Sequence, residues 1–227
     1  QDQLLTLHSF NPLLCSPSPR DIREVEEALK GIGYDILYAK YFPIQEAGEK
    51  LRQYFLEHEE YTHLIWCPDD LVIRKMHVDA IEETLQENQF DILSGVCNVD
   101  TDEGKDLLSI TKNLPHPTRV NEFGYGWRYY DWYHKSEVEG IMKVKHSGNA
   151  AGTFSRRIME KLPFRDDSGF NTDKGRFGSV DVVLSNTCAQ YHLPLICNTD
   201  IRMLHMRHSG QIDITIGDGF MEFIKNT

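Results

Sequence analysis

Over the first hundred residues, short apolar stretches alternate with longer segments of helical periodicity. Strands are expected at the ranges 3–10, 34–41, 64–67 and 90–97. Helices are expected at 21–30, 44–60 and 77–88, and the Pro- and Ser-rich range 12–19 is expected to be a loop. Strands joined by helices form right-handed crossovers, which favour parallel pairing. The pattern therefore predicts an α/β fold with a mostly parallel central sheet flanked by helices.

The second half of the chain breaks this rhythm. The range 98–144 is polar and then unusually aromatic, and it is followed by expected helices at 155–161 and 180–191 and an expected strand at 195–204. The aromatic stretch is too short to fold alone, so we interpret it as an insertion over the C-terminal edge of the sheet. A single domain is expected to span residues 1–227.

Composition excludes several classes of protein. With 227 residues and 40% hydrophobic content the chain can bury a full core. A formal charge of −11 argues against binding to nucleic acid or anionic membranes. No apolar run approaches the length of a membrane span. Five cysteines without CxxC spacing indicate a reducing compartment, and we expect the protein to be cytoplasmic.

Two carboxylates, Asp69 and Asp70, follow the apolar run that ends at Cys67. Acidic side chains at the C-terminal end of a buried strand lie where open α/β sheets bind ligands. Their oxygens are the hard ligands that Mg²⁺ or Mn²⁺ prefers. One of the two could instead cap a helix starting near Leu71, because Asp is a common N-cap residue. The sequence leaves both interpretations open.

Four features follow one another along the chain: an acidic pair after a strand, a small-residue segment, an acidic helix start and a late histidine. They occupy the ranges 68–70, 146–157 and 177–184 and position His205. In this order they resemble the GT-A family of nucleotide-sugar glycosyltransferases, and the resemblance extends from about Leu4 to His208. It implies a Rossmann-like domain with a nucleotide-sugar-binding half at 1–100 and an acceptor-side half at 101–227.

The resemblance assigns roles to the acidic pair and to the histidine. Asp70 matches the last carboxylate of an Asp-x-Asp motif, which holds Mn²⁺ or Mg²⁺ on the donor diphosphate, and Asp69 matches the middle residue, which faces the donor. Pro68 replaces the first Asp of that motif. His205 matches a C-terminal metal-binding histidine, and imidazole is a suitable Mn²⁺ ligand.

Asp181 matches the second position of the family's Glu-Asp motif, with Val180 in place of the Glu. In inverting members that carboxylate takes the proton of the acceptor hydroxyl, a role that suits an ionised Asp. Capping of the following helix is the alternative. Gly148 and Asn149 belong to the small-residue segment, where a backbone can approach a ligand closely. A turn needed only for packing is the alternative there.

The remaining predicted contacts concern the two substrates. By analogy with the family, the donor nucleoside is expected over the ends of the first two strands, at Ser9, Phe10 and Asn11, with Lys40 near the phosphates; a solvated surface cation is the alternative for Lys40. Aromatic faces suit sugar rings. An acceptor platform is therefore expected from three aromatic residues, Trp127, Tyr130 and Trp132. Core packing is the alternative for these rings.

The sequence thus predicts a metal-dependent glycosyltransferase that moves a sugar from a UDP- or GDP-sugar to a hydroxyl of a glycan, lipid or protein, with inversion. A nucleotidyltransferase is one alternative, although the range 10–20 lacks the Gly-rich basic loop typical of such enzymes. A non-catalytic nucleotide- or carbohydrate-binding module is another, because Pro68 and Val180 depart from the family motifs.

Overall fold

The structure is a computed structural model that describes residues 9–18, 20–99, 106–114, 130–164, 180–206 and 217–226. Its strands are β1 (Pro12–Ser18), β2 (Ile36–Lys40), β3 (His63–Trp66), β4 (Leu71–Val72), β5 (Ile92–Cys97), β6 (Leu107–Thr111), β7 (Trp132–His134), β8 (Ile141–Val144), β9 (His146–Ser147), β10 (Ala150–Ser155), β11 (Leu195–His205) and β12 (Phe220–Ile224). Its helices are α1 (Arg23–Lys30), α2 (Ile44–Glu57), α3 (Lys75–Asn88), α4 (Arg156–Met159), α5 (Val180–Gln190) and the 3-10 helix η2 (Lys135–Glu137).

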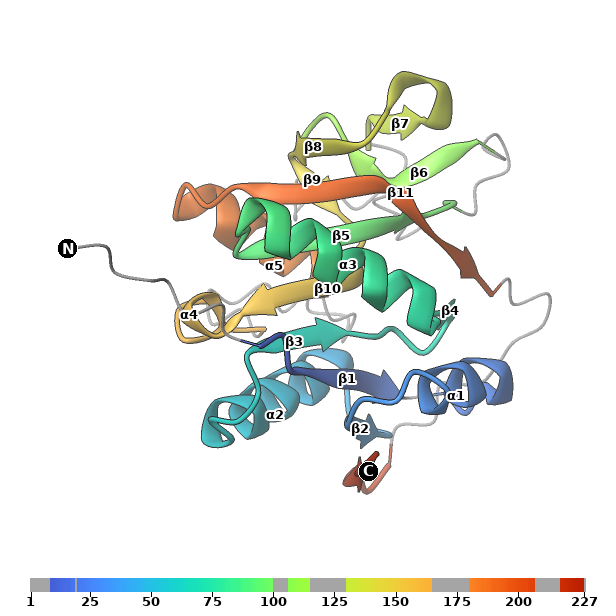
Figure 1. The fold of residues 1–227 in the computed structure, drawn as a ribbon, viewed down its shortest axis with the longest axis vertical. Coiled ribbons are helices and arrows are strands. Elements are labelled where there is room, and N and C mark those ends of the chain that lie inside the picture. Colours follow the sequence, from blue (N-terminus) through green and yellow to red (C-terminus); the bar gives the residue numbers. More distant parts are fainter. Residues whose placement is uncertain are drawn as a thin grey trace.

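The central sheet is mixed, so the prediction of a mostly parallel, Rossmann-like sheet is wrong. Its strand order is β12-β2-β1-β3-β10-β5-β11-β4, with β8 also paired to β11 (Figure 1). Parallel pairing joins β1 to β2, β1 to β3 and β5 to β11. Every pairing made by β10, β12, β4 and β8 in this sheet is antiparallel. The prediction of parallel pairing rested on the first half of the chain. It did not include these strands because most of them belong to the second half.

The strand β10 lies between β3 and β5 and separates two strands that are joined by α3 in the sequence. It belongs to the small-residue segment, for which we expected a close approach to a ligand, with a packing turn as the alternative. All of its residues except Ser155 are buried, because small side chains fit between the two helical layers on either side of the sheet. A register shift between Ala150 and Thr153 accompanies a positive φ at Ala151, 48°. The small residues therefore build the middle of the sheet.

The strand β1 occupies the range predicted to be a loop, and that prediction is wrong. All seven of its residues are buried, and it pairs in parallel with β2 and β3. Pro12 is its first residue, a position where a missing N–H is tolerated. The apolar residues Leu13, Leu14 and Cys15 outweigh the Pro and Ser content, because each is fully buried.

Two apolar layers cover the two faces of the sheet. One contains buried side chains of α2, α4 and α5, among them Leu51, Ile158 and Leu184. The other contains side chains of α1 and α3, such as Val25 and Ile81. The predicted helices at 21–30, 44–60, 77–88 and 180–191 are confirmed within a few residues by α1, α2, α3 and α5. Their apolar periodicity thus marked the buried faces correctly.

A second, three-stranded sheet of order β7-β6-β9 lies beside the central one (Figure 1). It includes the end of the aromatic stretch and carries Trp132 and His146 on β7 and β9. A hydrogen bond links it to β5 of the central sheet, where the Cys97 N–H donates to the Ser109 hydroxyl oxygen, Oγ, at 3.1 Å. The small sheet therefore brings the acceptor-side residues next to the end of β5.

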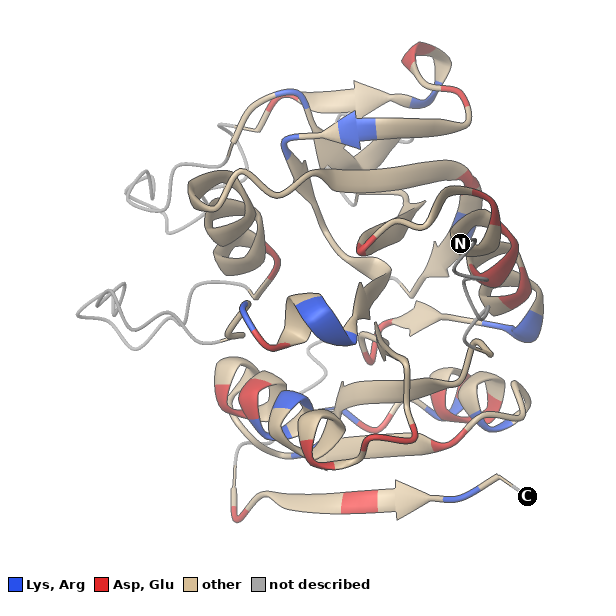
Figure 2. Cartoon of the chain, turned by 60° about the vertical axis from the view of Figure 1, so that its left-hand side comes forward, with Lys and Arg blue, Asp and Glu red and all other residues tan. Residues whose placement is uncertain are grey.

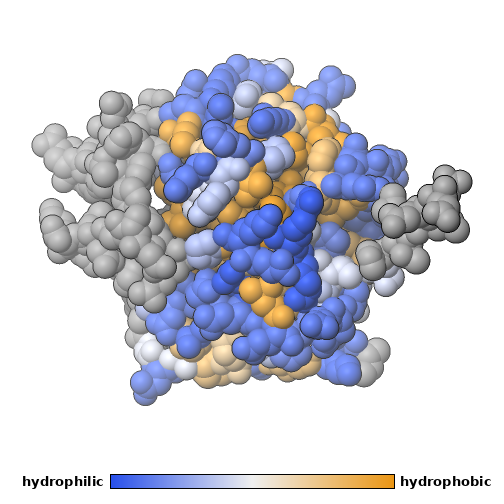
Figure 3. Space-filling view, turned by 90° about the vertical axis from the view of Figure 1, so that its left-hand side faces the viewer, coloured by the Kyte–Doolittle hydropathy of each residue, from blue (hydrophilic) through white to orange (hydrophobic). Residues whose placement is uncertain are grey.

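The surface agrees with an acidic chain. Acidic side chains dominate α3, whereas α2 carries both signs of charge (Figure 2). Hydrophilic side chains cover most of the face seen in Figure 3, with apolar patches between them. The five cysteines are buried free thiols. In the described part of the chain no helix is long and apolar enough to cross a membrane.

Candidate functional site

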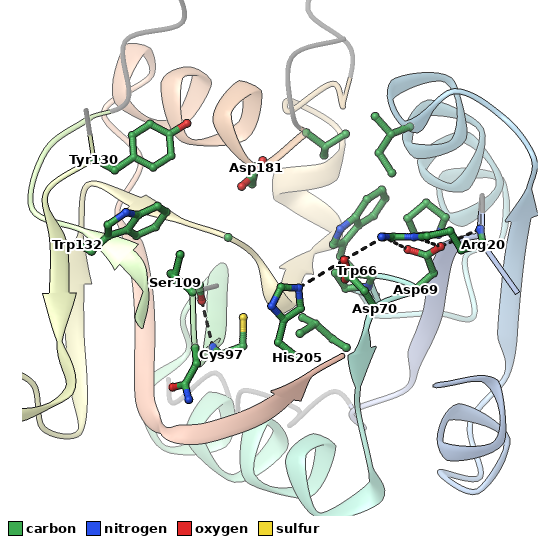
Figure 4. Close-up of a pocket in the computed structure, with 18 residues that line it drawn as sticks. Arg20, Trp66, Asp69, Asp70, Cys97, Ser109, Tyr130, Trp132, Asp181 and His205 are labelled. Carbon is green, nitrogen blue, oxygen red and sulfur yellow. Dashed lines mark hydrogen bonds and ion pairs between the residues drawn. The ribbon is translucent and has the colours of Figure 1, made fainter. Parts of the chain in front are cut away.

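A cavity of about 470 Å³ opens at the edge of the sheet where β1 and β3 end (Figure 4). Because these strands are parallel, the segments that follow them leave the sheet at one edge. Seven of the predicted site residues line the cavity: Asp69, Asp70, Tyr130, Trp132, Gly148, Asp181 and His205. Residues from both halves of the sequence therefore meet there.

Asp70 and His205 lie together because β4 pairs with the end of β11. His205 is opposite Leu71 in this antiparallel pair, and the Met206 N–H donates to the Asp70 carbonyl oxygen at 2.7 Å. Consequently His205 Nε2 lies 3.5 Å from Asp70 Oδ2. Neither Asp caps the next helix, since α3 begins at Lys75 with Arg74 as its N-cap residue. The capping alternative for the acidic pair is thus wrong.

Arg20, which the sequence reasoning did not select, binds both carboxylates. Its Nη2 lies 2.6 Å from Asp69 Oδ1 and 2.9 Å from Asp70 Oδ2, and its Nε and backbone N–H both donate to Asp69 Oδ2. Burial lowers the pKa of Arg20, but its bonds to Asp69 and Asp70 outweigh burial and raise it. A basic residue just after the first strand would have indicated a ligand-binding side chain. That prediction needs the strand to be placed at β1, where the sequence pattern did not place it.

The two ends of the cavity differ in electrostatics. Burial raises the pKa of Asp70, but His205 and Arg20 outweigh it, and the pKa of Asp70 lies below its usual value. Asp181 begins α5 across the cavity, and no Lys or Arg in the described ranges pairs with it. Burial raises the pKa of Asp181 to about 6, and the charge of Asp70 adds to this shift. Asp70 is therefore held as a carboxylate, whereas Asp181 is poised to take up a proton near neutrality.

The metal-binding capacity of the site rests on Asp70 and His205. No group of three or more His, Cys, Asp or Glu side chains in the described ranges could hold a metal ion. The separation of 3.5 Å between Asp70 Oδ2 and His205 Nε2 is close to the roughly 3 Å between neighbouring ligands of one Mn²⁺ or Mg²⁺. A carboxylate and an imidazole fit such an ion if a substrate supplies further oxygens. The pair suits an ion shared with a phosphate ligand.

Behind Asp181 lies His146, a fully buried residue of β9. Its Nδ1 lies 2.8 Å from Ser185 Oγ, and its Nε2 lies 3.7 Å from Asp181 Oδ2. Burial lowers the pKa of His146 to about 3, so the ring is neutral at pH 7. His146 is the first residue of the small-residue segment, and its sequence position gives no sign of a role because its neighbours are distant in sequence.

Two of the three predicted platform residues line the cavity beside Asp181. The rings of Tyr130 and Trp132 meet edge to face with centroids 4.8 Å apart, and Tyr130 lies 5.5 Å from the His146 ring. Both rings are half-buried, which leaves part of each open to the cavity. Burial and the charge of Asp181 raise the pKa of Tyr130 to about 12. Trp127 lies outside the described residues.

Gly148 and Asn149 differ in their relation to the cavity. Gly148 lines it, and its N–H donates to the Ser109 carbonyl oxygen at 2.7 Å. A Cβ added there would lie 3.1 Å from Ser109 Cβ, so this close approach favours glycine. Asn149 is buried beside the cavity with φ of 51° and does not line it.

The predicted donor residues Ser9, Phe10, Asn11 and Lys40 are not brought to the cavity. The first three precede β1, so they lie at the opposite end of that strand from Asp69. Most of the strand expected at 3–10 lies outside the described residues, and the strand that leads to the cavity is β1, which begins after these three residues. Lys40 is the last residue of β2, with its side chain 12% exposed and paired to Asp21, Glu26 and Glu222.

Comparisons with known proteins bear on the fold alone. No family model and no curated protein matches the sequence. The fold is similar to the crystal structure of A197 from STIV, with a TM-score of 0.54, 16% sequence identity, and coverage of 89% of this chain and 98% of that chain. The described topology therefore occurs in a solved protein of nearly the same extent.

Proposed function

We propose that the chain is a metal-dependent glycosyltransferase that moves a sugar from a nucleoside diphosphate sugar to a hydroxyl acceptor, with inversion. One observation carries the proposal: Asp70 and His205, far apart in sequence, lie 3.5 Å apart in a cavity that Asp181 also lines. These three side chains are the ones that the family resemblance singled out. Their convergence was not required by the packing of the core, since all three are polar.

The end of the cavity with Asp70 suits the donor diphosphate. Arg20 supplies a half-buried cation in an acidic chain, and a guanidinium binds phosphate oxygens well. A bound Mn²⁺ or Mg²⁺ would act as a Lewis acid that neutralises charge on the departing diphosphate. Asp69 is held by Arg20 at the same edge and can orient the donor sugar or ribose. UDP- and GDP-sugars are the donors that we propose.

The other end of the cavity suits the acceptor. Asp181 takes the proton of the acceptor hydroxyl while that oxygen bonds to the anomeric carbon, and the bond from that carbon to the diphosphate oxygen breaks with its electron pair. Tyr130 and Trp132 present ring faces on which a sugar or another hydroxyl-bearing acceptor can stack. A glycan, a lipid or a protein hydroxyl is the proposed acceptor, and no nucleic acid is involved.

We also propose a cytoplasmic location. The support is the state of the five cysteines, which are free thiols in buried positions, among them Cys97 at the cavity wall. Burial raises the pKa of the Cys97 thiol to about 11, so it stays protonated and unreactive. Thiols kept in this form are typical of a reducing compartment.

Thermal unfolding with UDP or GDP, each with and without Mn²⁺, tests the proposal. A ligand at one hundred times its Kd stabilises the folded state by about 2.7 kcal/mol, so the melting temperature should rise with nucleotide and Mn²⁺ together. Asp70→Ala and His205→Ala should each remove the Mn²⁺-dependent part of that rise. Asp79→Ala is the matched control, because Asp79 lies on α3 and pairs with Lys75 on the exposed surface. Retention of the full Mn²⁺ effect in both site variants would overturn the metal assignment.

A further inference from the structure

The buried ring of His146 is a polar group near the cavity to which the proposed reaction gives no role. It is fully buried, and its Nε2 has no hydrogen-bond partner in the parts of the chain that the structure describes. A buried ring nitrogen without a partner costs free energy. Asp181 Oδ2 lies 3.7 Å from this nitrogen.

The hydroxyl of Ser185 determines which nitrogen of His146 carries the proton. Ser185 Oγ lies 2.7 Å from the Asp181 carbonyl oxygen, and since a carbonyl oxygen only accepts, the hydroxyl proton must lie between them. That hydroxyl then has only lone pairs left for His146 Nδ1, at 2.8 Å. His146 Nδ1 is therefore the donor, and a neutral ring has its lone pair on Nε2.

The lone pair of His146 Nε2 thus faces the carboxylate of Asp181. Two acceptors that face each other without a proton repel, which agrees with a separation longer than a hydrogen bond. The other carboxylate oxygen, Asp181 Oδ1, is also buried and has no hydrogen-bond partner within the described ranges. One added proton would satisfy both Asp181 Oδ2 and His146 Nε2.

We propose that His146 is a positioning residue that accepts a hydrogen bond from Asp181 once Asp181 has taken the acceptor's proton. This inference rests on the proposed function, because it gives His146 a part in the same proton transfer. The proton leaves the acceptor hydroxyl, bonds to Asp181 Oδ2 and is held there by the lone pair of His146 Nε2. No charge is created on the ring, so its burial is not a cost at this step.

The backbone N–H groups of Val182 and Asp181 favour the ionised form of Asp181, whereas burial and the other groups around the pair outweigh them. Asp70 faces Asp181 across the cavity, and its negative charge disfavours a second carboxylate. Tyr130 packs on the His146 ring and is uncharged at pH 7, as is Cys97 from β5. The Trp132 ring lies on the same side, with its centroid 6.3 Å from that of His146. These neighbours favour the protonated form of Asp181 and add no cation.

Nuclear magnetic resonance of protein labelled with ¹⁵N histidine tests the pair without any substrate. Above the midpoint of titration, the His146 ring should carry its proton on Nδ1 and none on Nε2. Its Nε2 resonance should move through one midpoint, shared with the Asp181 carboxyl, as the pH is lowered. The His146→Gln spectrum identifies the resonances among those of the ten histidines. A proton on Nε2 of the neutral wild-type ring would overturn the proposal.

Ser185→Ala and Thr187→Ala form a matched pair of variants on α5. Both hydroxyls donate to the carbonyl oxygen four residues earlier, but only that of Ser185 also contacts His146. Ser185→Ala frees the ring to move its proton to Nε2 and to donate to Asp181. Such a bond favours the carboxylate, so the midpoint should fall by about one pH unit, and Thr187→Ala should leave it unchanged. Equal midpoints in the two variants would overturn the proposal.

Kinetics separate this inference from the proposed function. Release of UDP or GDP from a panel of sugar nucleotides is followed with Mn²⁺ between pH 5 and 8. Suppose that Ser185→Ala shifts the acidic limb of the pH profile of kcat by as much as it shifts the midpoint of the His146 resonance. The proposed function and the role of His146 are then both supported. Turnover with an unmoved limb overturns the role of His146 and leaves the glycosyltransferase. The resonance signature without turnover on any donor overturns the function and leaves only the proton-sharing pair.

Discussion

Asp70 and Asp181 are carboxylates of the same cavity, and their surroundings push them in opposite directions. Burial disfavours the charge of both. Asp70 has two cationic or potentially cationic neighbours within 3.5 Å, Arg20 and His205, and its pKa is lowered. Beside Asp181 lies the neutral ring of His146, and burial outweighs the backbone N–H groups of Val182 and Asp181, which lower the pKa, so the pKa of Asp181 is raised to about 6. The partner, and not the depth of burial, decides the sign of the shift.

This difference separates two chemical roles. A carboxylate that stays ionised is suited to a metal ion or a cationic partner, whereas one with a pKa near neutrality is suited to accept and release a proton. Two carboxylates with divergent pKa values in one cavity are a recurrent sign of divided roles. The comparison therefore predicts that the same substitution at the two positions has different and partly opposite effects.

The largest expected effect is on turnover. Asp181→Asn keeps the shape of the side chain and removes its basicity, so kcat should fall by roughly 10² to 10⁴, as is typical for loss of a general base. Donor binding should change little, because the donor end of the cavity is left intact. The measurement is steady-state kinetics together with titration of Mn²⁺ and UDP or GDP by calorimetry. An Asn variant of undiminished activity would mean that Asp181 has a structural role.

The second effect is on stability, where the two positions should show opposite signs. At pH 7.5 Asp181→Asn removes a buried charge and supplies a donor for His146, so it should raise the free energy of unfolding by roughly 1 to 2 kcal/mol. Asp70→Asn removes charged hydrogen bonds to Arg20 and His205 and should lower it by about 1 to 3 kcal/mol. Urea unfolding of both variants and the wild type measures the two differences. Changes of the same sign would contradict the comparison.

The pH dependence of the Asp181 effect has a definite direction. The folded pKa, about 6, lies above the unfolded value of about 3.9, so the folded state binds the proton more tightly. The resulting stabilisation is present below about pH 3.9 and is lost as the pH rises towards 6. The advantage of Asp181→Asn over the wild type should therefore vanish near pH 4 and be complete above pH 7. Unfolding curves at pH 4, 5, 6 and 7.5 would show this.

The smallest expected effect concerns the aromatic wall. Trp132 is half-buried and contacts Tyr130, so Trp132→Ala should raise the acceptor KM several-fold, in line with the roughly 0.5 to 1.5 kcal/mol of an aromatic contact. The affinity for UDP or GDP with Mn²⁺ should be unchanged. Kinetics with varied acceptor give the KM, and the melting temperature serves as the control. A loss of 3 kcal/mol or more in stability would identify the ring as core packing.

Local periodicity predicted the helices well, and it predicted the direction of strands poorly. The faces of α1, α2, α3 and α5 repeat every three to four residues, and this is a property of each segment by itself. Whether a strand is parallel or antiparallel to its neighbour depends on which distant segment of the chain pairs with it. The position of β10 between β3 and β5 could not be predicted from the sequence of either neighbouring strand.

The candidate site shows the same limit. The acidic pair and His205 were predicted from the order of motifs, and their contact arises from the pairing of β4 with β11. Arg20 was missed because the Pro and Ser content of β1 led us to predict a loop there. The end of the expected first strand was therefore not next to Arg20. His146 and Ser185 were missed because neither forms a motif with Asp181 in sequence. Three-dimensional proximity alone relates the three residues.

The central place of β10 has a consequence for how the chain is made. When residues up to Cys97 have left the ribosome, β3 and β5 are both present, but the strand that pairs with each of them is still to be synthesised. At about 5 to 20 residues per second, several seconds pass before residues 150–155 follow. During that interval β3 and β5 each have an edge without its partner strand, and such open edges invite pairing with other chains. Because β10 is synthesised late, early binding of a chaperone would protect the open strand edges of a chain with this topology.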